Sequence, residues 1–198
     1  MGSNSINKNI ANALKVIYAT YENVRKLIDH LYILASENSD YVSCTDKFLR
    51  WNKDKNIYSW ADHSFILIFQ SEKDVELDSG WRDGPLYVVD ISLCDNDEAS
   101  VYVARYDYSD VNMLPDRISS SNHHLLHNPL SHVDPEDDFI KYTYDGASYD
   151  GKVIDIAIAD KTYWGLRRIV GYLFPLTEIT SENAYEKVFG EFDKLSEK

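Results

Sequence analysis

The beginning of the chain carries a helical pattern of apolar side chains. Between residues 6 and 35 these recur in steps of three and four, at Ile6, Ile10, Leu14, Ile17, Tyr21, Val24, Ile28, Leu31 and Ala35. No glycine or proline interrupts the stretch, so it predicts one helix of about 45 Å at 1.5 Å per residue. We expect this helix to cover a sheet. A bend that divides it, or a dimer seam along its stripe, are the alternatives.

The middle of the chain is typical of strands that follow one another directly. Short apolar runs predict strands at 64–70, 86–93 and 101–108, and a hairpin is expected from 139–144 and 153–159. Because no helical pattern separates these runs, the strands should pair mainly antiparallel.

Helical patterns return near the C-terminus. Residues 161–173 predict a helix despite Gly165 and Gly171, and a final helix is expected over 182–196. The predicted fold class is therefore α+β: a mainly antiparallel sheet of about five strands, packed by a long N-terminal helix and C-terminal helices. We expect one domain over residues 1–198.

The segment 110–138 lacks periodicity and contains four of the six histidines of the chain. Imidazole and carboxylate groups together bind divalent transition metals. The candidate ligands of one such metal are His123, His127, His132 and Asp134. The interpretation that we favour is an irregular surface loop, with no cofactor.

Two aspartates stand inside apolar runs, Asp90 in VVDIS and Asp155 in VIDIA. A buried carboxylate is costly unless it is paired, so both could serve acid–base or metal chemistry on neighbouring strands. The simpler interpretation places them on the solvated side of a strand, or in ion pairs with Arg105 or Lys141.

The negative charge lies almost entirely in the middle of the sequence. Residues 72–160 hold 20 acidic and 6 basic residues, a net charge of −14, whereas the flanks hold 13 acidic and 14 basic residues, a net charge of +1. Acidic surfaces repel nucleic acid and anionic lipid, so neither is expected as a direct ligand. They attract basic proteins.

Motifs of common enzymes are missing from the sequence. It holds no G-x-G-x-x-G, G-x-x-x-x-G-K-[ST], G-x-S-x-G, C-x-x-C or H-E-x-x-H pattern, so the prediction leans away from an enzyme. The two cysteines, Cys44 and Cys94, form no disulfide framework, and no signal peptide or membrane-spanning run is present. A cytoplasmic location is therefore expected.

These observations favour an acidic protein-binding module. We expect an inhibitor or immunity-type (anti-defence) protein that mimics the charge of nucleic acid and engages a basic, nucleic-acid-processing partner, such as a nuclease or a defence effector. The partner-binding residues predicted are Glu72, Asp74, Glu76, Asp78, Asp134, Glu136, Asp137 and Asp138. The alternatives are a metal-dependent hydrolase or nuclease, and a structural or regulatory subunit that forms a homodimer.

Overall fold

An antiparallel sheet of eight strands forms the centre of the computed structural model, which describes residues 3–45, 47–51, 61–95, 98–119, 123–127, 130 and 139–197. The α-helices are α1 (Ser3–Asn38), α2 (Ile156–Thr162) and α3 (Ala184–Ser196), and the 3-10 helices are η2 (Val111–Met113), η3 (His124–Leu126) and η4 (Leu176–Glu178). The strands are β1 (Tyr41–Ser43), β2 (Leu49–Trp51), β3 (Ser64–Ser71), β4 (Leu86–Asp95), β5 (Glu98–Tyr108), β6 (Ile140–Asp145), β7 (Ser148–Val153) and β8 (Leu166–Pro175).

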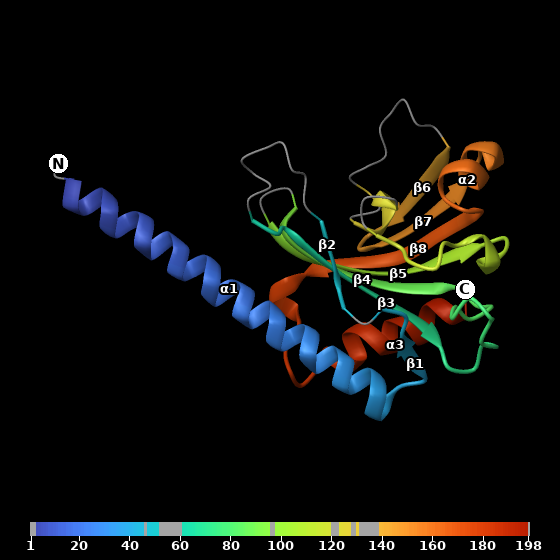
Figure 1. The fold of residues 1–198 in the computed structure, drawn as a ribbon, viewed down its shortest axis with the longest axis horizontal. Helices are drawn as coiled ribbons and strands as arrows, with labels where there is room; N and C mark the ends of the chain where they lie inside the picture. The colour runs from blue at the N-terminus through green and yellow to red at the C-terminus, as the bar shows by residue number, and fades with distance from the viewer. Residues whose placement is uncertain are drawn as a thin grey trace.

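The sheet follows the order β1-β3-β4-β5-β8-β7-β6, and β2 also pairs with β3 (Figure 1). The predicted α+β class is confirmed, with eight strands instead of about five. Two of the additional strands, β1 and β2, are short edge pairings on β3, and short strands of three residues leave little pattern in a sequence.

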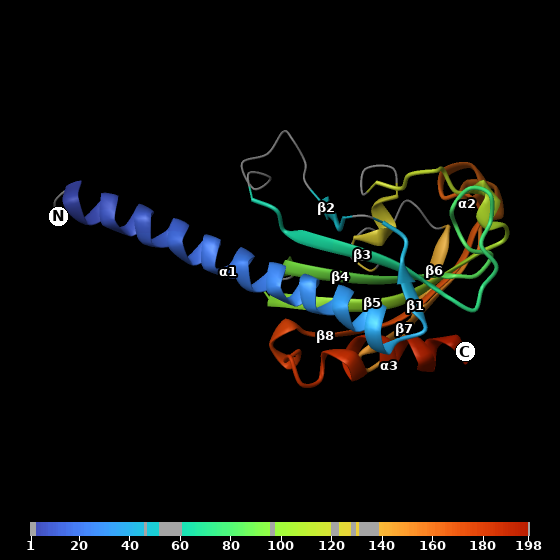
Figure 2. The ribbon, with the colours of Figure 1, turned by 60° about the horizontal axis from the view of Figure 1, so that its bottom comes forward.

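Both faces of the central strands are buried. Side chains alternate across a strand, so Phe69 and Val89 face one side while Ile68 and Val88 face the other. Figure 2 shows α1 and α3 lying against the first face. The second face is covered by connecting segments, including Val111–Ile118 and Leu125–Leu126.

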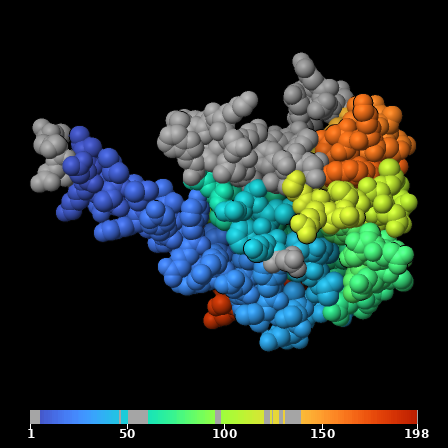
Figure 3. Space-filling model, in the orientation of Figure 1, coloured from blue at the N-terminus to red at the C-terminus, as the bar shows by residue number. Residues whose placement is uncertain are grey.

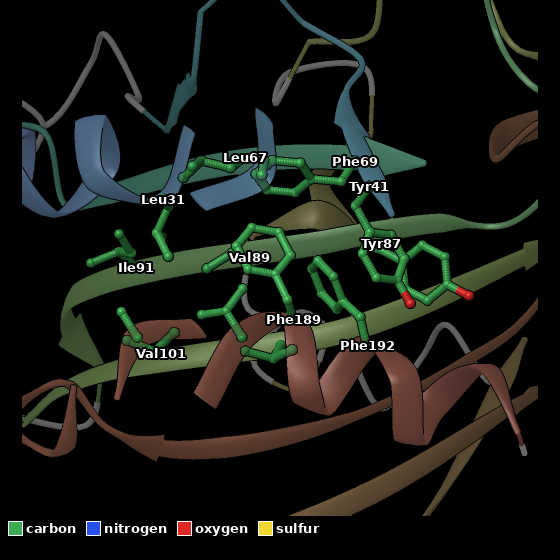
Figure 4. Packing of buried hydrophobic residues seen from close by; sticks show 14 of the residues in the cluster. Leu31, Tyr41, Leu67, Phe69, Tyr87, Val89, Ile91, Val101, Phe189 and Phe192 are labelled. Carbon is green, nitrogen blue, oxygen red and sulfur yellow. The ribbon is translucent and has the colours of Figure 1, made fainter. Parts of the chain in front are cut away.

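Aromatic rings from α3 fill the first face (Figure 4). Phe189 packs edge-on against Phe69 with ring centres 5.6 Å apart, and Phe192 lies 5.0 Å from Tyr87. Arg105 of β5 donates a hydrogen bond to the carbonyl of Leu195 at 2.9 Å, which satisfies an orphan group at the end of α3. The final helix predicted from the sequence is thereby confirmed and anchored.

The helix α1 has two different surroundings. Val24, Ile28, Leu31 and Ala35 are buried against the sheet, as predicted for a helix that covers it. Residues 6–19 are all exposed, and Figures 1 and 3 show this half extending away from the rest of the molecule. The helix is continuous over its described length, so it is not divided in two.

The predicted helix at 161–173 is wrong, because most of this stretch is strand β8. Trp164 and Gly165 have positive φ values of 50° and 84°, which a right-handed α-helix does not contain. Only the first two residues of the stretch, Lys161 and Thr162, are helical, as the end of α2. At Gly171 an added Cβ would lie 2.6 Å from the carbonyl oxygen of Val103, so the glycine permits close contact with β5. Burial on both faces gave β8 a pattern that resembled a helix.

The strand expected at 153–159 is also wrong. Strand β7 begins earlier, at Ser148, and ends at Val153, and α2 follows from Ile156. Asp155 is the N-cap of α2, and its carboxylate accepts hydrogen bonds from the N–H groups of Ala157 and Ile158. The alternating isoleucines that indicated a strand are instead largely exposed around this helix start.

The state of the two cysteines and the ability of the helices to cross a membrane were also predicted from the sequence. Cys44 and Cys94 are both free thiols. Within the part of the chain that the structure describes, no helix is both long and apolar enough to cross a membrane.

We expect shortening of a side chain on the buried face of α1 to destabilise the protein much more than shortening of one on its exposed face. Leu31→Ala should lower the free energy of unfolding by about 2–5 kcal/mol, because Leu31 is fully buried. Ile33→Ala should change it by no more than about 0.5 kcal/mol, since Ile33 is 50% exposed on the same turn. Urea unfolding of both variants measures the difference, and equal losses would contradict the described packing of α1.

Candidate functional site

Three connections that are distant in the sequence meet at one end of the sheet. They are 72–85 between β3 and β4, 109–118 after β5, and 154–165 between β7 and β8 (Figure 1, right side). The indole N–H of Trp81 donates to the carbonyl of Pro115 at 3.0 Å. The N–H of Ser109 donates to the carbonyl of Gly165 at 2.8 Å. These bonds join the three connections into one surface.

The first connection, 72–85, is held together by a cation inside it. The Arg82 guanidinium donates to the carbonyls of Glu72 at 3.2 Å and Asp74 at 2.8 Å, and lies 3.6 Å from the carboxylate of Glu76. Glu76 and Arg82 also form an isolated β-bridge. Part of the loop's negative charge is thus balanced internally, and its backbone shape is fixed.

The four acidic residues predicted for partner binding in this loop do not share one orientation. Glu72, Glu76 and Asp78 are exposed, but Asp74 is half-buried and directed inward. An added Cβ on Gly84 would lie 1.7 Å from the Asp74 carboxylate, which shows how closely the two are packed. Burial raises the pKa of Asp74, with a further contribution from the nearby Asp83 carboxylate.

Three more carboxylates on this surface are held by backbone N–H groups. Asp83 accepts from Val75 at 2.9 Å, Asp110 accepts from Asn112 at 2.9 Å, and Asp155 caps α2. Such bonds fix the position of a carboxylate without a neutralising cation. Sequence reasoning did not include these three among the partner-binding residues, although aspartate before a turn or a helix start is a typical capping signal.

We name this surface the acidic edge. It consists of the exposed acidic residues Glu72, Glu76, Asp78, Asp83, Asp110 and Asp155. Its α2 portion also exposes three isoleucines: Ile154 is 60% exposed, Ile156 is 57% exposed and Ile158 is 39% exposed. The acidic edge therefore combines fixed negative charge with an apolar patch. The other predicted acidic residues, Asp134, Glu136, Asp137 and Asp138, lie outside the described residues.

A separate polar cluster lies within the second face of the sheet, around Asp90 of β4. Asp90 is fully buried, accepts a hydrogen bond from the Ser64 hydroxyl, and has its other oxygen 3.2 Å from Nδ1 of His127. The ring nitrogen and the carboxylate oxygen are thus within hydrogen-bond distance of each other. Asp90 does not meet Asp155, which caps α2, so these two aspartates are not a pair on neighbouring strands.

The neighbouring His123 has a different role from His127. It is fully buried among the rings of Tyr106, Tyr163 and Trp164, and its Nε2 lies 2.7 Å from the Tyr108 hydroxyl. Burial raises the pKa of Tyr108, so the phenol stays protonated and shares a hydrogen bond with the imidazole. The aromatic surroundings and this bond fit a histidine that stabilises the core.

The histidines proposed as metal ligands thus bind different protein groups where they are described. His123 contacts Tyr108, and His127 contacts Asp90. Among the described residues no three His, Cys, Asp or Glu side chains are grouped as metal ligands. The other two candidates, His132 and Asp134, lie outside the described part of the chain.

Neutralising Asp74 should stabilise the protein near pH 7. Because folding raises its pKa, the folded state binds this proton more tightly than the unfolded state, so the ionised form opposes folding. The stabilisation by Asp74→Asn should be complete above the raised pKa and vanish below about pH 3.8, the ordinary value for the carboxyl group. Thermal unfolding from pH 3 to pH 7 measures this, with the exposed Asp78→Asn as a control. A variant less stable than the wild type at pH 7 would contradict the inward placement.

Comparison of the chain with protein-family models, with curated proteins and with solved structures finds no match.

Proposed function

We propose that this chain is an acidic protein-binding module that inhibits or sequesters a basic partner, and that the acidic edge is its binding surface. The observation that carries the proposal is the convergence of three connections into one surface with fixed carboxylates. The proposed partner is a basic, nucleic-acid-processing protein such as a nuclease or a defence effector, whose positive cleft would complement this charge. Direct binding to nucleic acid or to a membrane is not part of the proposal.

The way these carboxylates are held supports binding over a role in solubility alone. Solubility needs only mobile surface charge. Here Asp83, Asp110 and Asp155 are already ordered by backbone N–H groups, so less conformational entropy is lost when a partner binds. Fixed charges can also match the spacing of a partner's cations, which favours specificity and fast association.

The exposed isoleucines of α2 give the same surface an apolar component. Protein interfaces combine a desolvated apolar centre with a polar rim. Ile156 and Ile158 lie in the first helical turn after the capping residue Asp155, so apolar and acidic groups are close together on the acidic edge. A partner with basic residues around an apolar patch would satisfy both.

Charge reversal on the acidic edge should weaken capture of this partner. We expect wild-type protein with an affinity tag to retain a nucleic-acid-processing protein from a lysate of the source organism at low salt and to release it at high salt. Glu72→Lys combined with Asp78→Lys should slow association by about tenfold or more at low salt. Retention on beads identifies the partner, and surface plasmon resonance then gives the rates.

The control reverses a single charge at the opposite end of the sheet. Glu98 is exposed at the start of β5, away from the acidic edge, so Glu98→Lys should bind as the wild type does. Retention of the same protein by the wild type and both variants would overturn the acidic edge as the binding surface. Retention of no nucleic-acid-processing protein would overturn the proposed partner class.

One contact favours a second candidate, a metal-dependent hydrolase or nuclease. Asp90 orients the imidazole of His127, an arrangement in which a carboxylate can increase the basicity of a metal ligand or of a general base. Elemental analysis of the purified protein tests it. We expect no stoichiometric metal. One divalent transition metal per chain, lost in His127→Ala, would favour the hydrolase over the binding module.

A further inference from the structure

A cavity of about 320 Å³ lies where the end of α3 meets the connection 72–85. Its walls come from the surroundings of β1, from the end of β3 and the loop that follows it, and from β4, β5 and α3. Figure 1 shows the C-terminus close to this connection at the right of the sheet. Because the connection 72–85 also carries part of the acidic edge, the cavity adjoins that surface.

The side chain of Asp74 lies in the wall of this cavity without a cation bound to it. Its Oδ2 atom is buried and has no hydrogen-bond partner, and within the described residues Asp74 forms no ion pair. Burial and then the Asp83 carboxylate raise the pKa of Asp74, and they outweigh Arg82 and Arg105, which lower it. A carboxylate oxygen buried without a donor is costly. A ligand that brings an N–H group to it would remove this cost.

A second carboxylate, that of Asp193, lines the same cavity from α3. It accepts a hydrogen bond from the Tyr41 hydroxyl at 3.1 Å, and it has no ion pair in the part of the chain that the structure describes. Asp193 lies in the last turn of α3, where the helix dipole favours a cation. Lys194, the basic residue of that turn, pairs with Glu186 and Glu191 instead. The end of α3 therefore adds negative potential to the cavity.

The two cations that line the cavity are already engaged by other groups. Lys73 forms an ion pair with Asp40, and its side chain is 74% exposed. Arg105 donates from Nε to the Asp107 carboxylate at 2.8 Å and from Nη1 to the carbonyl of Leu195 at 2.9 Å. The carboxylates on the α3 side and on the connection 72–85 are thus left without a cation, and the cavity favours a positively charged ligand.

The arrangement fits an organic cation better than a metal ion. Among the described residues no three His, Cys, Asp or Glu side chains are grouped closely enough to hold a metal. A cation with several N–H groups can reach acceptors that are farther apart. Tyr41 and Tyr87 add hydroxyl oxygens that can accept, and their rings are held rigidly, 4% and 3% exposed with centres 4.9 Å apart (Figure 4). The volume is near the lower limit for ligand sites, so the ligand is small.

We propose that this cavity binds a primary ammonium or guanidinium group on a short alkyl chain. The N–H groups of the ligand donate to the carboxylates of Asp74 and Asp193, at opposite walls of the cavity. Such a group can belong to a free amine, or to a lysine or arginine side chain of a protein bound on the acidic edge. The proposal does not require that the acidic edge binds a protein.

Titration of the pure full-length protein with n-propylguanidinium, followed by amide NMR spectra, tests the proposal. The signals of Asp74, Tyr87 and Asp193 should shift, with a dissociation constant on the order of 1 mM for a ligand of about seven non-hydrogen atoms. Salt at about 0.15 M screens binding to other acidic residues. The neutral n-butanol should leave these signals in place. Absence of shifts at the cavity with n-propylguanidinium, or equal shifts with n-butanol, would overturn the proposal.

Two variants test the role of the Asp74 carboxylate. Asp74→Asn should weaken binding by about tenfold or more, because a hydrogen bond to a charged group is lost. Gly84→Ala keeps every charge, but its Cβ would lie 1.7 Å from the Asp74 carboxylate, which must move, so binding should also weaken. Asp145→Asn removes the same charge at an exposed position outside the cavity and should bind as the wild type does.

Thermal unfolding separates lost binding from lost structure, since Asp74→Asn is expected to be at least as stable as the wild type near pH 7. A folded Asp74→Asn protein that binds n-propylguanidinium with wild-type affinity would overturn the assignment. This assay uses the pure protein, whereas capture by the acidic edge uses a lysate. Failure of the cavity and failure of the proposed function are therefore distinguishable.

Comparison of cations distinguishes the two sources of the ligand. The arginine and lysine side-chain analogues are n-propylguanidinium and n-butylammonium, and spermidine represents free polyamines. Spermidine binding at least tenfold more tightly than both analogues would assign the cavity to a free polyamine. Similar affinities for all three would assign it to a single basic group, as a partner's side chain supplies.

Discussion

Burial of the central strands on both faces determines how the other elements are arranged. Strands β3, β4, β5 and β8 cannot leave one face to water, so each needs two covers. The helices α1 and α3 supply the first cover, and irregular connections supply the second. Charged side chains have little space between these layers. They are displaced to the connections at the sheet ends, which is where the acidic edge forms.

The exception inside the layers is Asp90, and its surroundings follow from the same constraint. A carboxylate with no exposure needs hydrogen-bond donors close to it. Ser64 from the adjacent strand and His127 from the covering segment supply them. This contact also ties the segment around η3 to the sheet. The cluster therefore has a structural explanation whether or not it has a chemical role.

The sequence was informative wherever one pattern had one structural cause. The stripe of α1, the apolar strands at 64–70 and 86–93, and the final helix were all predicted correctly. Errors arose where a two-sided environment removed the periodicity, as in β8, or where a capping residue resembled part of a strand, as with Asp155. The acidic edge could be predicted only in part, because Asp110 and Asp155 become neighbours of the connection 72–85 only when the chain folds.

The place of β8 in the sheet has a consequence for how the chain is made. This strand is late in the sequence but lies between β5 and β7, so the hairpin of β6 and β7 reaches the rest of the sheet only through it. During synthesis β5 therefore presents an open edge of backbone N–H and carbonyl groups until residues 166–175 leave the ribosome. The interval between these two strands is the time in which a nascent chain is most exposed to wrong strand pairing with another copy.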